Sequence, residues 1–293
     1  MQINTNTINI LFNIVFISQI ILLSWYYPNK IINRIKKVMK DYPPSEYPKL
    51  YLKPQSYYQK KIDIFSNLTF FGLISCFSVV LISWSMGNSP VEEMLIVICF
   101  ALQIIPILLL GITSTIHFKN MKIAHKTTSR SANLQPRKFF DFVSPLLFSF
   151  AIILFITFMY IYLYTHDYDL SKTEVLITFI GAPLLQFYFM GMLIWKLNSG
   201  KSNPLISEAD RVREIKVVAK IAVYASIAMS VFLIMMTVMD EYKSLDALDP
   251  VVLSLYMQLI TVFGIGTELR SVKIDQVDFD VYKNDEHSKL TAV

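Results

Sequence analysis

Four glutamines in apolar segments are the residues of this chain best placed for chemistry. They are Gln19, Gln103, Gln186 and Gln258. An amide in hydrocarbon needs a hydrogen-bond partner, so these side chains should point into a helical bundle and bond across helices or to water. Two interpretations stay open, because the amides either hold helices together or line a polar path or cavity. Pro106 and Pro183 lie near two of them and are the expected kink sites.

Other side chains that could do chemistry are scattered along the sequence. The four histidines are far apart and have no Cys or carboxylate at metal-ligand spacing. The sequence has no paired acids inside an apolar segment and no nucleophile and base at a recognisable spacing. Cys76 and Cys99 fall in apolar runs and are expected to be small buried hydrophobes. We therefore expect no catalytic residue, no metal and no cofactor.

Composition places the chain in a membrane. Of 293 residues, 54% are hydrophobic and 17% are charged, and the mean hydropathy is +0.47. The net charge of +5 comes from clusters that flank apolar runs. A nucleic-acid-binding protein would carry one continuous basic face, so no nucleic-acid partner is expected. The basic clusters indicate contact with anionic lipid headgroups instead.

Seven segments are apolar and long enough to cross a bilayer as helices. They are 8–26, 64–86, 93–116, 140–164, 173–197, 217–239 and 250–268. If the connection 27–63 is cytoplasmic, all Lys and Arg except Lys172 and Lys243 lie on that side. The positive-inside rule then predicts an outside N-terminus and a cytoplasmic C-terminus. The fold class is an all-α polytopic membrane protein, with one transmembrane domain over 1–268 and a polar cytoplasmic tail over 269–293.

The first part of the long connection is basic. Apolar residues of 30–40 recur on one helical face, opposite Lys30, Arg34, Lys36, Lys37 and Lys40. This pattern favours an amphipathic helix lying in the inner headgroup region. The alternative is an inward extension of the first spanning helix.

The second part, which we call the Tyr/Pro segment, covers 41–58. Its characteristic residues are Tyr42, Pro43, Pro44, Tyr47, Pro48, Tyr51, Tyr57 and Tyr58. Its prolines oppose a regular helix, and its aromatic content is too high for a loose linker. We expect an ordered extended segment that packs on the helix ends or the lipid surface, and it is the candidate contact surface for a protein partner or a second copy of the chain.

Two weaker patterns concern repeats and ends. After the first helix, three pairs of spans each run inward to outward and back, which suggests three hairpin repeats. Ser207 to Asp210 reads as a capping box that opens the sixth span well inside the cytoplasm, and Ala222, Ser226 and Ser230 form a small-residue stripe. Alternating residues suggest a short strand over 272–282 that pairs with cytoplasmic segments or with a partner, and the alternative is a disordered tail.

The leading functional hypothesis is a non-enzymatic structural or partner-binding membrane protein, with the Tyr/Pro segment as its contact surface. One alternative is a channel or carrier for a small neutral solute, lined by the four glutamines. The other is a membrane-embedded lipid-modifying enzyme. The small number of glycines, the frequent Ile and Asn and the short outer connections indicate a bacterial inner membrane.

Overall fold

The chain is all-helical in the computed structural model, which describes residues 5–85, 93–124, 139–198, 206–243 and 245–283. The α-helices are α1 (Thr5–Ile21), α2 (Tyr27–Asp41), α3 (Gln55–Ser85), α4 (Glu93–Ala124), α5 (Pro145–Thr165), α6 (Thr173–Asn198), α7 (Glu208–Glu241), α8 (Asp249–Thr261) and α9 (Thr267–Ser271). Single 3₁₀ turns cover Pro48–Leu50, Phe139–Asp141, Asp246–Leu248, Ile274–Gln276 and Asp280–Tyr282.

Seven helical stretches of the described residues are long and apolar enough to cross a membrane, so the chain is a multi-pass membrane protein. Two of the stretches contain a π-helical turn. Leu22–Tyr26 joins α1 to α2, and Val262–Gly266 joins α8 to α9. Large apolar side chains such as Phe70, Phe187 and Trp195 are exposed on the outer helix faces, where lipid rather than water would cover them.

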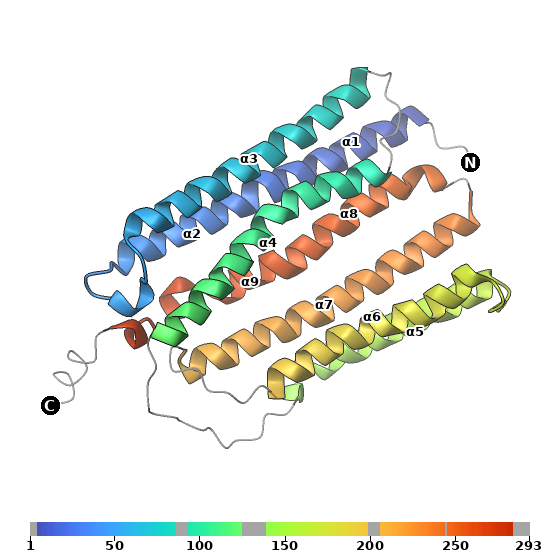
Figure 1. Ribbon diagram of the computed structural model, residues 1–293. Helices are drawn as coiled ribbons and strands as arrows, with labels where there is room; N and C mark the ends of the chain where they lie inside the picture. Colours follow the sequence, from blue (N-terminus) through green and yellow to red (C-terminus); the bar gives the residue numbers. More distant parts are fainter. Residues whose placement is uncertain (1–4, 86–92, 125–138, 199–205, 244, 284–293) are drawn as a thin grey trace.

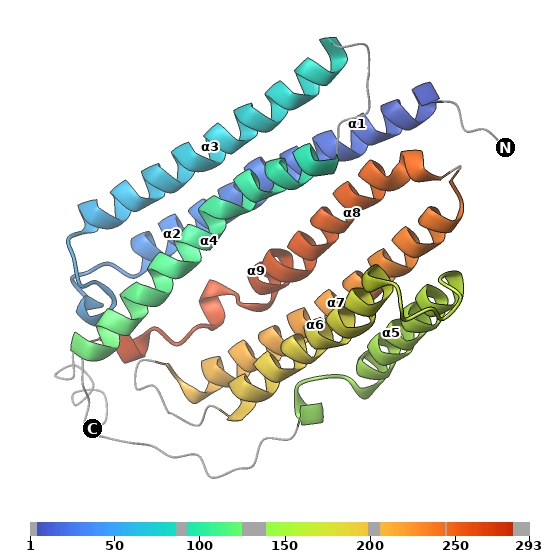
Figure 2. The ribbon, with the colours of Figure 1, turned by 45° about the vertical axis from the view of Figure 1, so that its right-hand side comes forward.

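The helices run side by side along one direction (Figure 1). Helices α1, α3 and α4 form one group and α5, α6 and α7 another, and α8 packs on α1, α4 and α7 between them (Figure 2). We call the end that holds the α2–α3 connection, the start of α7 and the segment after α9 the basic end. Helix α1 begins at the opposite end.

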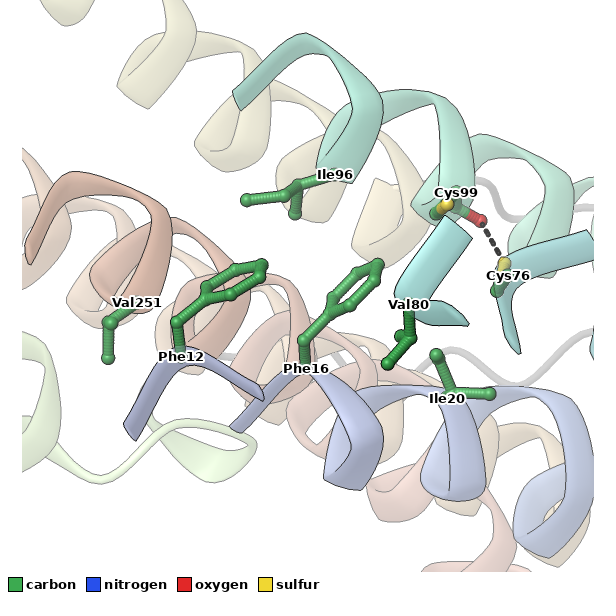
Figure 3. Close-up of a cluster of buried hydrophobic side chains, with 8 residues drawn as sticks. All are labelled: Phe12, Phe16, Ile20, Cys76, Val80, Ile96, Cys99 and Val251. Carbon is green, nitrogen blue, oxygen red and sulfur yellow. Dashed lines mark hydrogen bonds between the residues drawn. The ribbon is translucent and has the colours of Figure 1, made fainter. Parts of the chain in front are cut away.

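The first group is built on an aromatic and aliphatic core. Phe12, Phe16 and Ile20 of α1 meet residues of α3, α4 and α8 (Figure 3). Cys76 and Cys99 lie in this core, buried and unbridged, and the Cys76 thiol donates to the Cys99 carbonyl oxygen at 3.7 Å. Burial of these large apolar side chains fixes how α1, α3 and α4 pack.

A proline and a glycine explain the close approach of α3 and α4. Pro106 has no N–H, so the carbonyl of Leu102, four residues earlier, loses its helical donor. That oxygen faces Gly72 of α3, where an added Cβ would stand only 3.3 Å from it. Pro183 likewise lies inside α6. Both prolines are therefore accommodated within continuous helices.

The second group uses small residues. Ala219, Ala222 and Ser230 of α7 are buried, and α7 packs extensively on α5 and also on α6. Ser207 caps α7, because its Oγ accepts a hydrogen bond from the Asp210 N–H at 3.2 Å. The predicted cap is confirmed, and α7 begins nine residues before its predicted apolar span.

The basic segment is not a separate interfacial helix. A single helical stretch, Thr7–Asp41, carries the first span directly into α2 through the π turn. The apolar stripe of α2 packs on the protein, because Ile32 and Met39 form a buried cluster with Ile62 and Phe65 of α3. The inward extension, our alternative interpretation, describes the backbone correctly.

Two other local predictions are wrong. No strand forms over 272–282, which instead contains the 3₁₀ turns Ile274–Gln276 and Asp280–Tyr282. The Tyr/Pro segment is not extended throughout. It turns at Pro43 and Pro48, and α3 begins at Gln55, so Tyr57 and Tyr58 are helical. Pro54 does not prevent this, because a proline fits just before the first helical turn.

Candidate functional site

Gln19 and Gln103 bond directly to each other inside the first helical group. Gln19 Nε2 donates to Gln103 Oε1 at 3.2 Å, and Gln19 Oε1 accepts from the Ser254 hydroxyl at 2.7 Å. The side chains of all three residues are buried. The amide of α1 thus joins α4 on one side and α8 on the other.

Gln258 bridges the same α1–α8 seam one turn further along α8. Its Nε2 donates to the Val15 carbonyl oxygen at 3.0 Å, and its Oε1 accepts from the Ser18 hydroxyl at 3.1 Å. Because Ser254 and Gln258 are four residues apart, both lie on the helix face that meets α1. This seam is therefore cross-linked at two successive levels.

Gln186 belongs to a different seam. Its Oε1 accepts from the Ser226 hydroxyl at 2.6 Å, and its Nε2 donates to the Ser230 hydroxyl at 3.3 Å. Both serines belong to the small-residue stripe of α7. Three of the predicted glutamines are thus gathered around α1 and α8, whereas the fourth joins α6 to α7 and borders a largely apolar cavity of about 280 Å³.

Three polar atoms of the first span and α4 lack a partner in the described part of the chain, and two of them belong to residues that were not singled out from the sequence. Asn13 Oδ1, Ser24 Oγ and Gln103 Nε2 are buried and have no hydrogen-bond partner within the described residues. A polar side chain inside the apolar segment of the first span is the signal that could have identified Asn13 and Ser24. Buried polar groups without a partner are uncommon, so they are the points where the seam is least satisfied.

The chain has no counterpart among the proteins with which it was compared. No family model, curated protein or solved structure matches it. The candidate site is therefore assigned from geometry alone.

The Tyr/Pro segment is held together by its own aromatic residues. The Tyr51 hydroxyl donates to the Tyr42 carbonyl oxygen at 2.8 Å, and the Tyr58 hydroxyl accepts from the Leu52 N–H at 3.1 Å. Burial raises the pKa of the Tyr51 phenol above its usual range. These contacts fold the segment into a fixed shape without regular secondary structure before α3.

The tail segment, residues 272–283, docks on this structure. The Phe279 ring stacks on Tyr42 with 3.8 Å between centroids, and Lys283 lies over the Tyr47 ring. Tyr42 and Tyr47, two of the predicted partner contacts, are thus partly occupied by the chain itself. Tyr57, near the end of the Tyr/Pro segment, has the Lys53 and Lys61 ammonium groups over its ring.

The tail segment also binds α2 and α7 through polar contacts. Lys37 Nζ lies 2.8 Å from Asp275 Oδ1, which lowers the pKa of that carboxyl group. Arg213 donates to the Gln276 carbonyl oxygen at 2.7 Å, and the Asp278 N–H donates to Asp210 Oδ2 at 3.0 Å. The tail segment thereby joins the first helical group to the start of α7.

The five basic residues of α2 have different surroundings. Lys30, Lys36, Lys37 and Lys40 are exposed, and Lys37 pairs with Asp275. Arg34 is half-buried and faces a cavity between α2, α4 and α9. Only the exposed lysines are positioned to meet lipid headgroups.

Tyr282 should report on tail docking at alkaline pH. Burial and the carboxylates of Asp210 and Asp278 raise the pKa of its phenol to about 12 from the usual 10.0. Because the docked state favours the neutral phenol, Tyr282 contributes its full stabilisation of docking below pH 10. This contribution is lost as the pH rises through 12. The difference in tyrosinate absorbance between the intact chain and Tyr282→Phe should titrate near 12. A difference that titrates near 10 would show an undocked tail.

Proposed function

We propose that this chain is a non-enzymatic membrane protein whose basic end binds a protein partner. The supporting observation is the brace between Tyr42 of the Tyr/Pro segment and Phe279 of the tail segment, together with the tail's bonds to α7. We call the Tyr/Pro segment and the docked tail segment together the platform. A rigid platform loses little conformational entropy on binding, which favours a specific contact surface over a linker.

The proposal includes a topology. The basic end lies in the cytoplasm and the N-terminus outside, because nearly all Lys and Arg fall at the basic end or in its connections. The membrane is the inner membrane of a bacterium, and the three helix pairs after the first span are repeats of one hairpin. These statements rest on charge, composition and sequence pattern.

Cysteine labelling tests the topology with little background, since both native cysteines are buried. Ser45 lies exposed in the platform, and Ser171 lies exposed in the α5–α6 connection at the opposite end. In intact cells, a membrane-impermeant maleimide should label Ser171→Cys and leave Ser45→Cys unlabelled until the membrane is permeabilised. The reverse pattern would refute the orientation, and equal labelling of both in intact cells would refute a single topology.

Site-specific photocrosslinking tests the partner. A photoreactive amino acid at exposed Ser45 or Glu46 should give one protein adduct of fixed mass in living cells. The matched control is Phe187, which is 71% exposed on α6 and should crosslink to lipid. If the platform gives no protein adduct, the proposal is refuted. If the adduct consists of two copies of the chain, the platform mediates self-association and does not bind a different protein.

The two other functions have less support. A carrier of small neutral solutes is favoured only by the three buried polar atoms of Asn13, Ser24 and Gln103. Against it, Gln19, Gln186 and Gln258 bond to neighbouring helices. A lipid-modifying enzyme would need a nucleophile and a base that face a substrate. The Thr165 hydroxyl lies 3.1 Å from His166 Nδ1 at the end of α5, but both atoms also contact the Tyr162 carbonyl oxygen.

A further inference from the structure

A cavity of about 660 Å³ lies at the basic end beneath the Tyr/Pro segment. Its walls come from α2, α4 and the π turn and helix that end the last span, and Leu50, Tyr51 and Tyr58 cover it. This volume is typical of sites for small ligands and cofactors. Its floor is apolar, with Ile107 and Leu110 of α4 facing it.

Three polar side chains around the cavity are engaged in holding the cover. The ring Nε2 of His117 lies 3.3 Å from the Leu50 carbonyl oxygen, and the His117 ring packs edge-on against Tyr58. The Tyr51 and Tyr58 hydroxyls bond to the backbone of the Tyr/Pro segment. These three residues therefore shape the cavity and have little capacity left for a ligand.

Arg34 and Glu268 are the two opposite charges that line the cavity. Arg34 belongs to α2 and Glu268 to α9, and the two interact electrostatically across the space. No nitrogen–oxygen distance of 4 Å or less joins them in the part of the chain that the structure describes. A half-buried guanidinium without a direct anionic partner is costly, so a group that bonds to it would be stabilised.

The two charges and the apolar floor together define a ligand class. Arg34 suits a phosphate, since its planar guanidinium can donate two parallel hydrogen bonds. Glu268 suits an ammonium group next to that phosphate. Ile35, Ile107, Leu110 and Ile265 offer an apolar surface for a hydrocarbon chain.

We propose that this cavity binds a zwitterionic amphiphile of the phosphoethanolamine lipid class. Its phosphate meets Arg34, its ammonium meets Glu268 and one acyl chain lies along the apolar floor. This site is independent of the partner proposed above. The partner would bind the outer surface of the platform, and the Tyr/Pro segment separates that surface from the cavity.

Binding is tested with the full chain in detergent and a fluorescent single-chain phosphoethanolamine lipid. The expected result is saturable binding that weakens at least about tenfold in Arg34→Gln, as for loss of a charge-assisted pair. Lys36→Gln is the matched control, because Lys36 is exposed on the same helix and does not line the cavity. Equal effects of the two substitutions would overturn the site.

Glu268→Gln tests the head group. The substitution should weaken binding of the phosphoethanolamine lipid. Binding of a phosphoglycerol lipid of the same chain length should not change, because that lipid has no ammonium group. If binding of both lipids weakens equally, the proposed contact between Glu268 and a lipid ammonium group is refuted. Free phosphoethanolamine should bind far more weakly than the lipid, and equal affinity would show a headgroup site without a chain site.

Gly111 offers a variant that blocks the cavity without crowding its neighbours. It lines the cavity, and an added Cβ there meets no atom within 4 Å. Gly111→Leu should abolish lipid binding while the thermal unfolding temperature does not fall. Gly181→Leu is the control, since Gly181 lies on α6 and is equally open. Normal binding by folded Gly111→Leu would overturn the proposal.

Discussion

Replacing Gln19 with leucine should lower the free energy of unfolding by about 2–4 kcal/mol. The substitution keeps most of the volume but removes the donor to Gln103 and the acceptor for Ser254. Gln103 would then hold both ends of its amide unpaired in a buried interface, because its Nε2 already lacks a partner within the described residues. Reversible unfolding in mixed detergent micelles measures the loss.

A double-mutant cycle separates this bond from general packing. Gln19→Leu with Gln103→Leu should cost clearly less than the sum of the single changes, because the orphaned amide disappears with its partner. Gln258→Leu provides the comparison and should cost only about 1 kcal/mol, since it leaves a backbone carbonyl and an exposed serine behind. Strict additivity of the Gln19 and Gln103 changes would show that their hydrogen bond contributes nothing.

The second large effect concerns the two glycines of the π turn in the last span. A Cβ at Gly266 would stand 2.5 Å from the Tyr27 hydroxyl oxygen, whereas a Cβ at Gly264 meets no atom within 4 Å. Tyr27 is only 5% exposed, so its ring has little room to move. Gly266→Ala should therefore destabilise the protein by about 1–3 kcal/mol. Gly264→Ala should be neutral or stabilising by up to about 1 kcal/mol.

Tyr27→Phe provides the rescue, because it removes the oxygen that the added methyl would strike. The combination Gly266→Ala with Tyr27→Phe should recover most of the stability that Gly266→Ala loses, measured by the same unfolding experiment. If both alanine variants unfold at the same temperature, the close approach of the first and last spans at this level is wrong.

The spans could be predicted from the sequence because the bilayer sets their length and apolar character. The extensions could not be predicted in the same way. The stripe of Ile32 and Met39 on α2 fits equally well against lipid or against Ile62 and Phe65, and only the fold shows that it packs on protein. Likewise, the alternation over 272–282 arises from residues that dock on different neighbours and not from a strand.

The amides show the same division. The need of Gln19 and Gln186 for partners follows from their residue type, but the identity of Ser254 and of the Ser226–Ser230 pair depends on which helices meet. The π turns gave no sequence signal, because Leu22–Tyr26 and Val262–Gly266 contain nothing that demands an extra residue per turn. The cavity was missed because its two charges, Arg34 and Glu268, lie far apart in the chain.

The hydrogen bond between Gln19 and Ser254 has a consequence for biosynthesis. The two residues are 235 positions apart, so at a synthesis rate of about 5–20 residues per second the first helix waits on the order of ten seconds or more for the last. Gln103, only 84 positions away, emerges earlier and can pair with Gln19 first. Helix α8 is made after α1, α4 and α7, the helices that it packs on, and it enters between α1 and α7. The last spanning segment is therefore the one that fixes the first in place.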